Sequence, residues 1–337
     1  MNQEWNDFLL QQGFAADFEH CGHLADEARA ASIVVPLVDS ALIRASGEDN
    51  AAFLHNLMTN DVTGIAADGV RYAGFCTPKG RLLATFLIWH EGADLWLQTS
   101  ADIQPAMQKK LSMYILRSKA KLYNGADGET ARVLVGLAGP QAPAALAVLG
   151  MGTPPGINQI AAIEGGQVVG VAANRYILAL DLAAAKAAWP VLKQHATPAG
   201  LNAWRLRDIA DGLPRIVAAT QEQFIPQMVN FEAVGGVSFK KGCYPGQEIV
   251  ARTQYLGKIK RRMYRVAVDA VTSAGADLYA PETGAQSCGN VVLSAQTDAN
   301  ASEALVVLQA STVEAGEVHL GSPNGPTLRF LELPYEN

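Results

Sequence analysis

Cysteine is scarce in this sequence, with four residues among 337 and no C-x-x-C pair. Cys21, Cys76, Cys243 and Cys288 lie too far apart for the dense framework of a small disulfide-rich domain. A permanently bound iron–sulfur cluster, which normally takes four thiolates, is not indicated either. We therefore predict four free thiols and a reducing compartment, the cytoplasm.

Long apolar runs and common cofactor motifs are also absent. The stretch Leu82 to Trp89 has the length of a strand, whereas a membrane-spanning helix needs about 20 apolar residues. No basic region followed by an apolar core marks a secretory signal. The sequence contains no Walker A loop, G-x-G-x-x-G, H-E-x-x-H or G-x-S-x-G. His20-Cys21-Gly22-His23 lacks an evident fourth metal ligand, so we interpret it as a polar helix end and expect no metal site.

The residues that are present favour a globular α+β protein. With 49% hydrophobic and 17% charged residues, the composition is ordinary, and the length suggests two or three domains. Helical and strand periodicities are mixed up to about residue 257. The predicted strands there are 33–44, 71–77, 81–90, 133–139, 167–173 and 176–180, and the predicted helices include 104–119, 143–149, 182–195 and 247–255. Beyond residue 262, four short strands at 263–268, 290–294, 304–309 and 327–333 predict a small β-barrel.

Charge is unevenly distributed along the chain. Residues 240–265 contain eight lysines and arginines and one acid, Glu248, although the whole chain has a net charge of −6. A basic segment on an acidic chain indicates either an anionic partner or a solvated face near a domain junction. Tyr264 lies within the run, and basic segments that carry aromatic residues can bind RNA.

The most informative stretch runs from Ser238 to Glu248 and reads S-F-K-K-G-C-Y-P-G-Q-E. Pro245-Gly246 fits the two central positions of a type II turn, where glycine supplies the positive φ. A helix over 247–255 would follow. Cys243 then lies just before a helix N-terminus and beside two lysines, of which Lys241 is one, and both features favour a thiolate. The alternative is a buried structural cysteine, which is the usual role of a free cysteine.

The run K-G-C-Y-P-G-Q-E, followed by Arg252, Tyr255 and Gly257, resembles the signature of the YgfZ family, which is itself similar to the T-protein of the glycine cleavage system. Weaker family-like markers occur in the expected order along nearly the whole chain. These markers are Gly47, Asp49, Phe53-Leu54, Thr59-Asn60-Asp61-Val62, Lys79-Gly80-Arg81, Leu137-Ala138-Gly139-Pro140, Gly212-Leu213-Pro214, Phe224-Ile225-Pro226-Gln227, Asn230, Gly235-Gly236, the stretch from Lys258 to Arg262, and Leu333-Pro334-Tyr335.

The resemblance implies a T-protein-like fold of three domains around a central folate site. We place these domains at 1–135, 136–257 and 258–337. The first two would be α+β, with the cysteine motif in the second, and the third would be the β-barrel. Members of the family bind tetrahydrofolate and help to maintain iron–sulfur enzymes, including radical enzymes that methylthiolate tRNA. The implied partners are therefore folate, iron–sulfur enzymes and, indirectly, tRNA. No membrane partner is implied.

The resemblance also implies roles for individual residues. Cys243 would be the working residue, with Lys241 as its activating neighbour. Trp204 matches a folate-contacting tryptophan, and its alternative role is core packing. The other predicted folate-site residues are Gln247, Glu248, Arg252 and Tyr255. We assign the basic run at 258–265 to a folate tail or a protein partner in preference to direct contact with RNA.

Several positions depart from the related patterns. Ser40 stands where some members carry a tryptophan. Ala210 stands where the T-protein has a pterin-binding carboxylate, and in this chain Asp208 and Asp211 flank that position. We therefore expect a weaker folate site or a different set of ligands. Leu83 and Ala84 occupy the place of an aspartate that assists aminomethyl transfer in the T-protein. An apolar side chain cannot carry a proton, so glycine-cleavage chemistry is not expected.

Three functions stay open on the sequence. The first is a tetrahydrofolate-binding accessory protein for iron–sulfur cluster assembly or repair and tRNA methylthiolation, acting through Cys243. The second is a folate-dependent one-carbon transferase for aminomethyl or methyl groups. The third is a non-catalytic module that docks RNA or a protein through residues 240–265.

Overall fold

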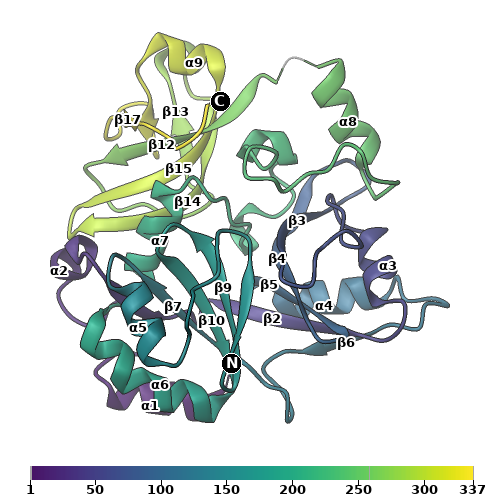
Figure 1. Ribbon diagram of the computed structural model, residues 1–337. Helices are drawn as coiled ribbons and strands as arrows, with labels where there is room; N and C mark the ends of the chain where they lie inside the picture. Colours follow the sequence, from purple (N-terminus) through teal and green to yellow (C-terminus); the bar gives the residue numbers. More distant parts are fainter. Residues whose placement is uncertain (1, 258, 337) are drawn as a thin grey trace. The chain divides into compact units, whose positions relative to one another are not determined.

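The computed structural model describes residues 2–257 and 259–336, and the chain divides into two compact units. Unit 1 comprises Met1–Leu54, Val62–Arg71 and Phe86–Trp204, and unit 2 comprises His55–Asp61, Tyr72–Thr85 and Arg205–Asn337. The division into three domains stays a prediction. Helices and strands are mixed along the chain (Figure 1), which confirms the α+β class.

A six-stranded sheet lies in unit 1. Its order is β11 (Thr197–Pro198), β1 (Ile33–Pro36), β7 (Val133–Ala138), β10 (Arg175–Leu180), β9 (Gly166–Ala172) and β8 (Ile160–Ile163). The pair β1 and β11 is parallel, and the other neighbours are antiparallel. Every residue of β7 and β10 is buried. These central strands are covered on both faces, which explains why they read as nearly continuous apolar runs.

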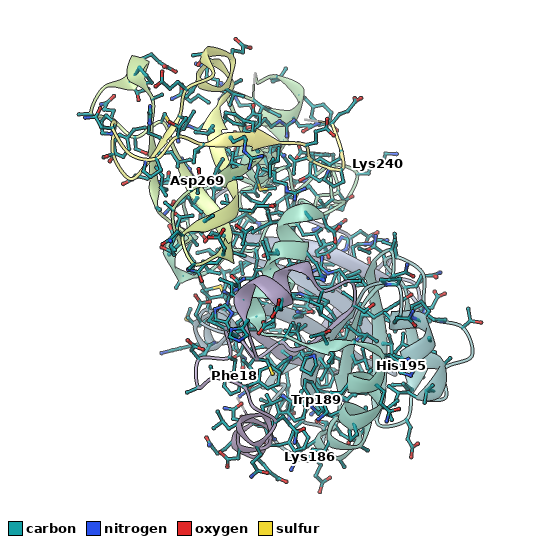
Figure 2. All side chains as sticks on the ribbon, turned by 90° about the vertical axis from the view of Figure 1, so that its left-hand side faces the viewer. Phe18, Lys186, Trp189, His195, Lys240 and Asp269 are labelled. Atoms are coloured by element: carbon teal, nitrogen blue, oxygen red, sulfur yellow. The ribbon has the colours of Figure 1, made fainter. Side chains whose placement is uncertain are left out.

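The N-terminal helix packs on a longer helix of unit 1. The helices of this part of the chain are α1 (Gln3–Gln11), α2 (Leu24–Arg29), α4 (Gln104–Ser112), α5 (Ala142–Val148), α6 (Leu182–His195) and α7 (Leu201–Ala210). Trp189 of α6, which is labelled in Figure 2, meets Trp5 edge-on with ring centroids 6.0 Å apart. The centroid of its ring lies 5.7 Å from that of Phe14. The carboxylate of Asp181 caps α6, and the helix continues through Pro190 over the predicted range.

Helix α4 is shorter than the sequence predicted. The expected range was 104–119, but the helix ends at Ser112. Tyr114 and Leu116 are 42% and 87% exposed, so the buried apolar face stops at Leu111. The prediction was wrong because apolar residues continue in sequence after the packing surface has ended.

A second sheet has five strands. Its order is β3 (Val70–Cys76), β4 (Leu82–Glu91), β5 (Asp94–Ser100), β2 (Ser40–Ser46) and β6 (Lys121–Asn124). The single strand predicted over 33–44 is wrong, because β1 and β2 belong to different sheets. The chain turns between them, where the Ser40 N–H donates to the Leu37 carbonyl. The hairpin around Pro78-Lys79-Gly80 is confirmed, with the Thr77 N–H donating to the Arg81 carbonyl at 2.8 Å.

The third sheet lies in unit 2 and is antiparallel. Its order is β16 (His319–Leu320), β13 (Asp277–Tyr279), β14 (Gly289–Asp298), β15 (Ala301–Gln309), β12 (Arg261–Val268) and β17 (Arg329–Leu331). The sheet curls into a half-barrel (Figure 1), in agreement with the β-barrel predicted for the C-terminal part of the chain. Met263 packs in one core cluster and Val266 in another, as residues on opposite faces of a strand should.

Short helices complete the described chain. They are α3 (Asn50–His55), α8 (Gln247–Tyr255), α9 (Ala310–Ala315) and the 3₁₀ helices η1 (Ala218–Thr220), η2 (Pro226–Val229) and η3 (Pro281–Thr283). Helix α8 has the range that the sequence predicted. Over the residues that the structure describes, no helix has both the length and the apolar character needed to cross a membrane.

Candidate functional site

Cys243 lies in the loop that precedes α8, and it is the exposed member of the four free cysteines. Cys76 and Cys288 are buried, and Cys21 is partly buried. Burial raises the pKa of the Cys76 thiol to about 12 and that of the Cys21 thiol to about 11. Cys243 is therefore the thiol best placed to meet a reagent in solution, and the alternative of a buried structural cysteine does not apply to it.

Lys241 is fixed by the chain segment that follows α3. Its Nζ donates to the main-chain carbonyls of His55 and, at 2.8 Å, of Met58. These groups lie at and just after the C-terminus of α3, where carbonyls lack helical partners and attract a cation. The ammonium also lies 4.9 Å from the centroid of the Tyr244 ring. The cysteine loop is thus attached to the segment after α3 through Lys241, which also contacts Tyr244 on the other side of Cys243.

The Lys241 amine titrates at an unusually low pH. Burial lowers its pKa from 10.5 to about 8, and the charges of Asp61 and Cys243 oppose that shift. Ammonium and neutral amine are therefore both populated near pH 8. The ammonium can stabilise an anionic sulfur, and the neutral amine can accept a proton.

Two residues of the site, His55 and Asp61, are not predicted from the sequence as functional residues, since Asp61 belongs only to a family-like marker and His55 to no motif. His55 Nδ1 lies 3.0 Å from Asp61 Oδ1. The same His55 supplies a carbonyl to Lys241, and Asp61 acts electrostatically on that lysine. Nothing in the local sequence signals this, because Lys241 lies far along the chain from both residues.

Thr59 and Asn60 connect their own family-like marker to the marker Gly235-Gly236. The Thr59 hydroxyl donates to the Gly236 carbonyl and accepts from the Gly74 N–H, each at 2.7 Å. Asn60 Nδ2 donates to the Gly235 carbonyl at 2.6 Å and to the Tyr72 carbonyl at 2.7 Å. The segment after α3 is therefore hydrogen-bonded to β3 on one side and to the chain leading into the cysteine loop on the other.

The turn before α8 contacts the hairpin between β3 and β4. Gly246 has φ 83° and ψ 1°, and the Gln247 N–H donates to the Tyr244 carbonyl at 3.1 Å, which confirms the predicted type II turn. A Cβ atom on Gly246 would lie 2.7 Å from the Cα of Gly80. Only glycine fits so close an approach of two backbones. The K-G-R hairpin and the K-G-C-Y-P-G-Q-E run are therefore one structural feature.

Comparisons with known proteins identify the family and the fold of the chain. The chain is 35% identical over 260 residues to the tRNA-modifying protein YgfZ of Vibrio vulnificus (strain YJ016), with 74% of this chain and 73% of the relative covered. The chain belongs to the YgfZ family. Among solved structures, the glycine cleavage system aminomethyltransferase T of Bartonella henselae superposes with a TM-score of 0.76 over 99% of this chain and 97% of its own. At 18% identity this likeness shows the fold alone, and it confirms the T-protein-like fold. No family model matches the sequence.

The other motif residues of this YgfZ-family chain lie along α8. Gln247 is partly buried, whereas Glu248, Arg252 and Tyr255 are exposed. The last three are spaced by four and three residues, so they share the outer face of the helix. Their predicted role in folate binding stays a prediction.

Trp204 of α7 is packed inside unit 1 and is 4% exposed. The Arg175 guanidinium lies 4.2 Å from the centroid of its ring. On β7, a Cβ atom at Gly136 would come within 2.6 Å of the ring carbons Cε3 and Cζ3. The glycine thus makes room for the indole. This packing accounts for the residue by itself, and the role of Trp204 in folate binding stays a prediction.

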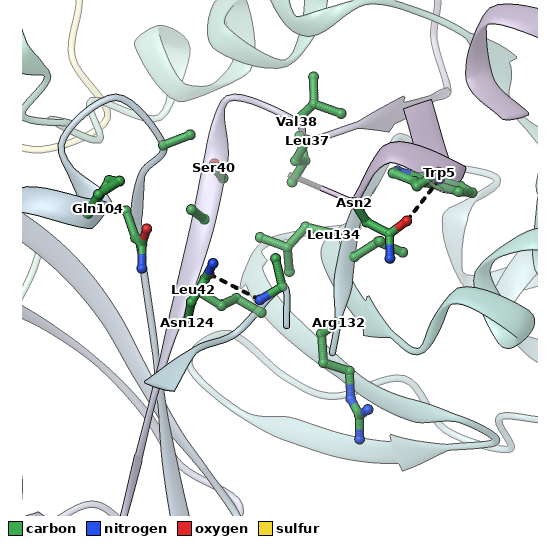
Figure 3. Close-up of a pocket in the computed structure, with 15 residues that line it drawn as sticks. Asn2, Trp5, Leu37, Val38, Ser40, Leu42, Gln104, Asn124, Arg132 and Leu134 are labelled. Carbon is green, nitrogen blue, oxygen red and sulfur yellow. Dashed lines mark hydrogen bonds between the residues drawn. The ribbon is translucent and has the colours of Figure 1, made fainter. Parts of the chain in front are cut away.

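The departures from the family pattern have clear environments. Leu83 and Ala84 are buried in β4, at 3% and 0% exposure, so neither side chain can take part in proton transfer. Ala210 is the last residue of α7 and is half-buried. Ser40 lines a cavity of about 180 Å³ in unit 1 (Figure 3).

That cavity has mostly apolar walls, and its lining also includes polar residues. Its walls are formed chiefly by Leu37, Val38, Ala41, Leu42, Pro105, Val133 and Leu134. Among the described residues, neither Trp5 Nε1 nor Arg132 Nε has a hydrogen-bond partner, and both atoms are buried. Asn124 and Asn2 also line the space and hydrogen-bond to nearby backbone N–H groups (Figure 3). An apolar slot with a few polar groups is the usual form of a small-molecule site.

The sequence predicts no metal site at His20-Cys21-Gly22-His23. In the structure, the main chain of this segment donates hydrogen bonds to a carboxylate. The buried Glu27 carboxylate accepts from the N–H groups of Cys21 and Gly22, each at 2.6 Å, and from Gly200 at 2.7 Å. Across the residues described, no group of three His, Cys, Asp or Glu side chains is arranged to hold a metal ion.

Proposed function

We propose that this protein is a tetrahydrofolate-binding accessory factor for iron–sulfur enzymes that modify tRNA, and that it acts through Cys243 in the cytoplasm. Membership of the YgfZ family supports the connection with tRNA modification, since the curated relative is described as a tRNA-modifying protein. The observation that carries the proposal is the exposed Cys243 thiol beside a lysine that the fold anchors with two carbonyls.

The chemistry of the site follows from this pair of residues. A thiolate attacks sulfur or carbon electrophiles and can ligate iron transiently. Lys241 stabilises the anionic sulfur as an ammonium, and as an amine it takes up the proton that the thiol releases. Asp61 favours the charged form of Lys241, and the contact between its Oδ1 and His55 Nδ1 at 3.0 Å holds that carboxylate in place. One-carbon transfer of the glycine-cleavage type has no acid to use at Leu83 or Ala84.

A pterin fits the donors that unit 1 presents. Its ring carries carbonyl and ring-nitrogen acceptors, and the cavity beside Ser40 is lined in part by Trp5 and Arg132, each of which has a buried N–H group without an acceptor. A tryptophan at position 40, as in some family members, would narrow this space, whereas serine leaves it open. Tetrahydrofolate would supply a one-carbon carrier, and these side chains would bind and orient its ring.

The decisive experiment is complementation of a strain that lacks the endogenous factor. Cys243→Ser should fail to restore 2-methylthio modification of tRNA, measured by mass spectrometry of digested tRNA, at an expression level equal to wild type. Cys288→Ser is the matched control, because this thiol is buried in the barrel core. Full restoration by Cys243→Ser, or equal loss in the control, would reject the role of Cys243.

A further inference from the structure

The basic segment contains two kinds of cation. Arg262 pairs with Glu232, and Arg265 pairs with Glu303 at 2.7 Å. Lys241 is held by carbonyls, as described above, and Lys258 lies outside the described residues. These interactions leave four cations for a partner: Lys240, Arg252, Lys260 and Arg261. None of the four pairs with a carboxylate within residues 2–257 and 259–336.

A groove of about 470 Å³ lies in unit 2 among η2, α8 and the start of β12. Its lining residues are Ile225, Met228, Thr253, Ile259, Lys260, Arg261 and Gln309. The lining thus combines three apolar side chains, two of the unpaired cations and an amide. Two of the elements around the groove are linked directly, because Gln227 Nε2 of η2 donates a hydrogen bond to the Val250 carbonyl of α8 at 2.7 Å.

An aromatic ring lies on the exposed face of the same helix. Tyr255 is 68% exposed, and the neighbouring Leu256 is 84% exposed. Phe239 supports the Tyr255 ring edge-on, with centroids 6.0 Å apart. Lys240 follows Phe239 in the chain, and its side chain extends away from the ribbon (Figure 2). Tyr264, the aromatic residue that the sequence analysis singled out, instead packs on Phe330 in the third sheet.

We propose that these residues form a binding surface for a single-stranded RNA loop. The α8 surface is defined as Lys240, Arg252, Tyr255, Lys260, Arg261 and the groove beside them. Phosphates would bind the four cations, one base would stack on Tyr255, and another would enter the groove, where the Gln309 amide can meet its edge. The inference rests on the proposed function, because it names the surface that would contact the tRNA. It replaces the preference for a folate tail or a protein partner on the run 258–265, because the groove and the exposed Tyr255 ring add sites for bases to the cations.

A single-stranded loop matches the α8 surface better than the alternatives do. A duplex offers phosphates but hides the faces of its bases, so it cannot use the exposed tyrosine or the apolar groove. An acidic protein segment offers carboxylates, which pair with the cations but make no use of the exposed tyrosine or the apolar groove. Unstacked nucleotides provide anionic groups, flat rings and hydrogen-bonding edges together.

The test measures binding of the full-length protein to a fluorescein-labelled RNA hairpin with an unpaired loop by fluorescence anisotropy. Four phosphate contacts on a single strand predict a loss of affinity of about 50-fold between about 50 mM and about 200 mM salt. Lys260→Gln/Arg261→Gln should lower the slope of log affinity against log salt by about 1.4. Tyr255→Ala should weaken hairpin binding at least fivefold, roughly the loss of one stacked base, and leave duplex binding unchanged.

The matched charge control is Lys109→Gln/Lys110→Gln on α4, which removes two cations from unit 1. It should keep the wild-type salt slope. Equal binding of hairpin and blunt duplex, an unaffected Tyr255→Ala, or equally effective competition by polyglutamate would overturn the inference. Cys243→Ser should bind the hairpin as wild type does. Failure of that variant in complementation therefore tests the proposed function separately from RNA binding.

Discussion

Lys241 Nζ donates a hydrogen bond of 2.8 Å to the carbonyl of Met58, a residue that is 183 positions away in the sequence. The lysine therefore joins the cysteine loop to the segment that follows α3. Its environment favours the neutral amine through burial and the ammonium through Asp61, with burial the larger effect. The lowered pKa of Lys241 that results can be measured through the pH dependence of the free energy of unfolding.

Lys241 should make stability depend on pH above 8. Its pKa is about 8 in the folded protein and 10.5 as an unperturbed group, so between these values the unfolded state binds more protons. The free energy of unfolding of wild type, relative to that of Lys241→Met, should therefore rise from pH 8 to pH 10.5. Urea denaturation of both proteins across this range measures the difference. A difference that stays constant or falls with pH would contradict the assigned shift.

Gly246→Ala should destabilise the protein, whereas Gly242→Ala should not. Gly246 has φ 83°, and an added Cβ would meet the backbone of the 77–80 hairpin. Strain and overlap together should cost about 2 kcal/mol or more. A Cβ on Gly242 would meet nothing within 4 Å, so its change should stay within about 0.5 kcal/mol. Denaturation midpoints of the two variants compare them directly, and similar losses would refute the close approach.

The features that the sequence predicted well are those with local signals. Pro245-Gly246 dictates a type II turn by itself, and the helix that follows needs no distant partner to begin at Gln247. The start of α6 was predictable for the same reason, because Asp181 is a good N-cap. The hairpin at Pro78-Lys79-Gly80 is a further local case. The exposure of Cys243 could be expected from its glycine-flanked turn.

The features that the sequence missed depend on distant contacts. The change of sheet after Pro36 is invisible locally, because both flanking strands are apolar and β-forming. His55 and Asp61 join the site through Lys241, and no periodicity encodes a pairing across so many residues. The burial of Trp204 depends on a glycine in β7 that leaves space for its ring.

Thr59→Val should be strongly destabilising. The Thr59 side chain is fully buried and joins the Gly74 N–H to the Gly236 carbonyl, and valine keeps its shape while removing the hydroxyl. Leaving two buried backbone groups unpaired should cost about 2–4 kcal/mol. Thr130→Val is the matched control, because Thr130 is exposed and its change should stay within about 0.5 kcal/mol. Chemical denaturation gives both values. A loss below 1 kcal/mol for Thr59→Val would show that the two backbone groups find other partners.

Trp204→Phe should separate a role in folate binding from a role in packing. The ring is 4% exposed and packs on Gly136 and Arg175, so truncation to alanine would cost about 3–5 kcal/mol and confuse the two roles. Phenylalanine retains an aromatic ring in the core. If the indole contacts the pterin, the affinity for tetrahydrofolate should fall by about 2- to 10-fold, as expected for a lost aromatic contact. Isothermal titration with tetrahydrofolate measures this affinity.

Trp89→Phe is the control for that titration, since Trp89 is equally buried and hydrogen-bonds to Gln167, and neither of these residues lines the cavity beside Ser40. Both substitutions should lower the free energy of unfolding, because each removes part of a buried ring from a close-packed core. Only the change at Trp204 should weaken the binding of tetrahydrofolate. If the two variants bind tetrahydrofolate as tightly as wild type does, Trp204 serves the core alone. Other groups must then hold the pterin, and Trp5 and Arg132, whose buried donors lack partners, are the first residues to substitute.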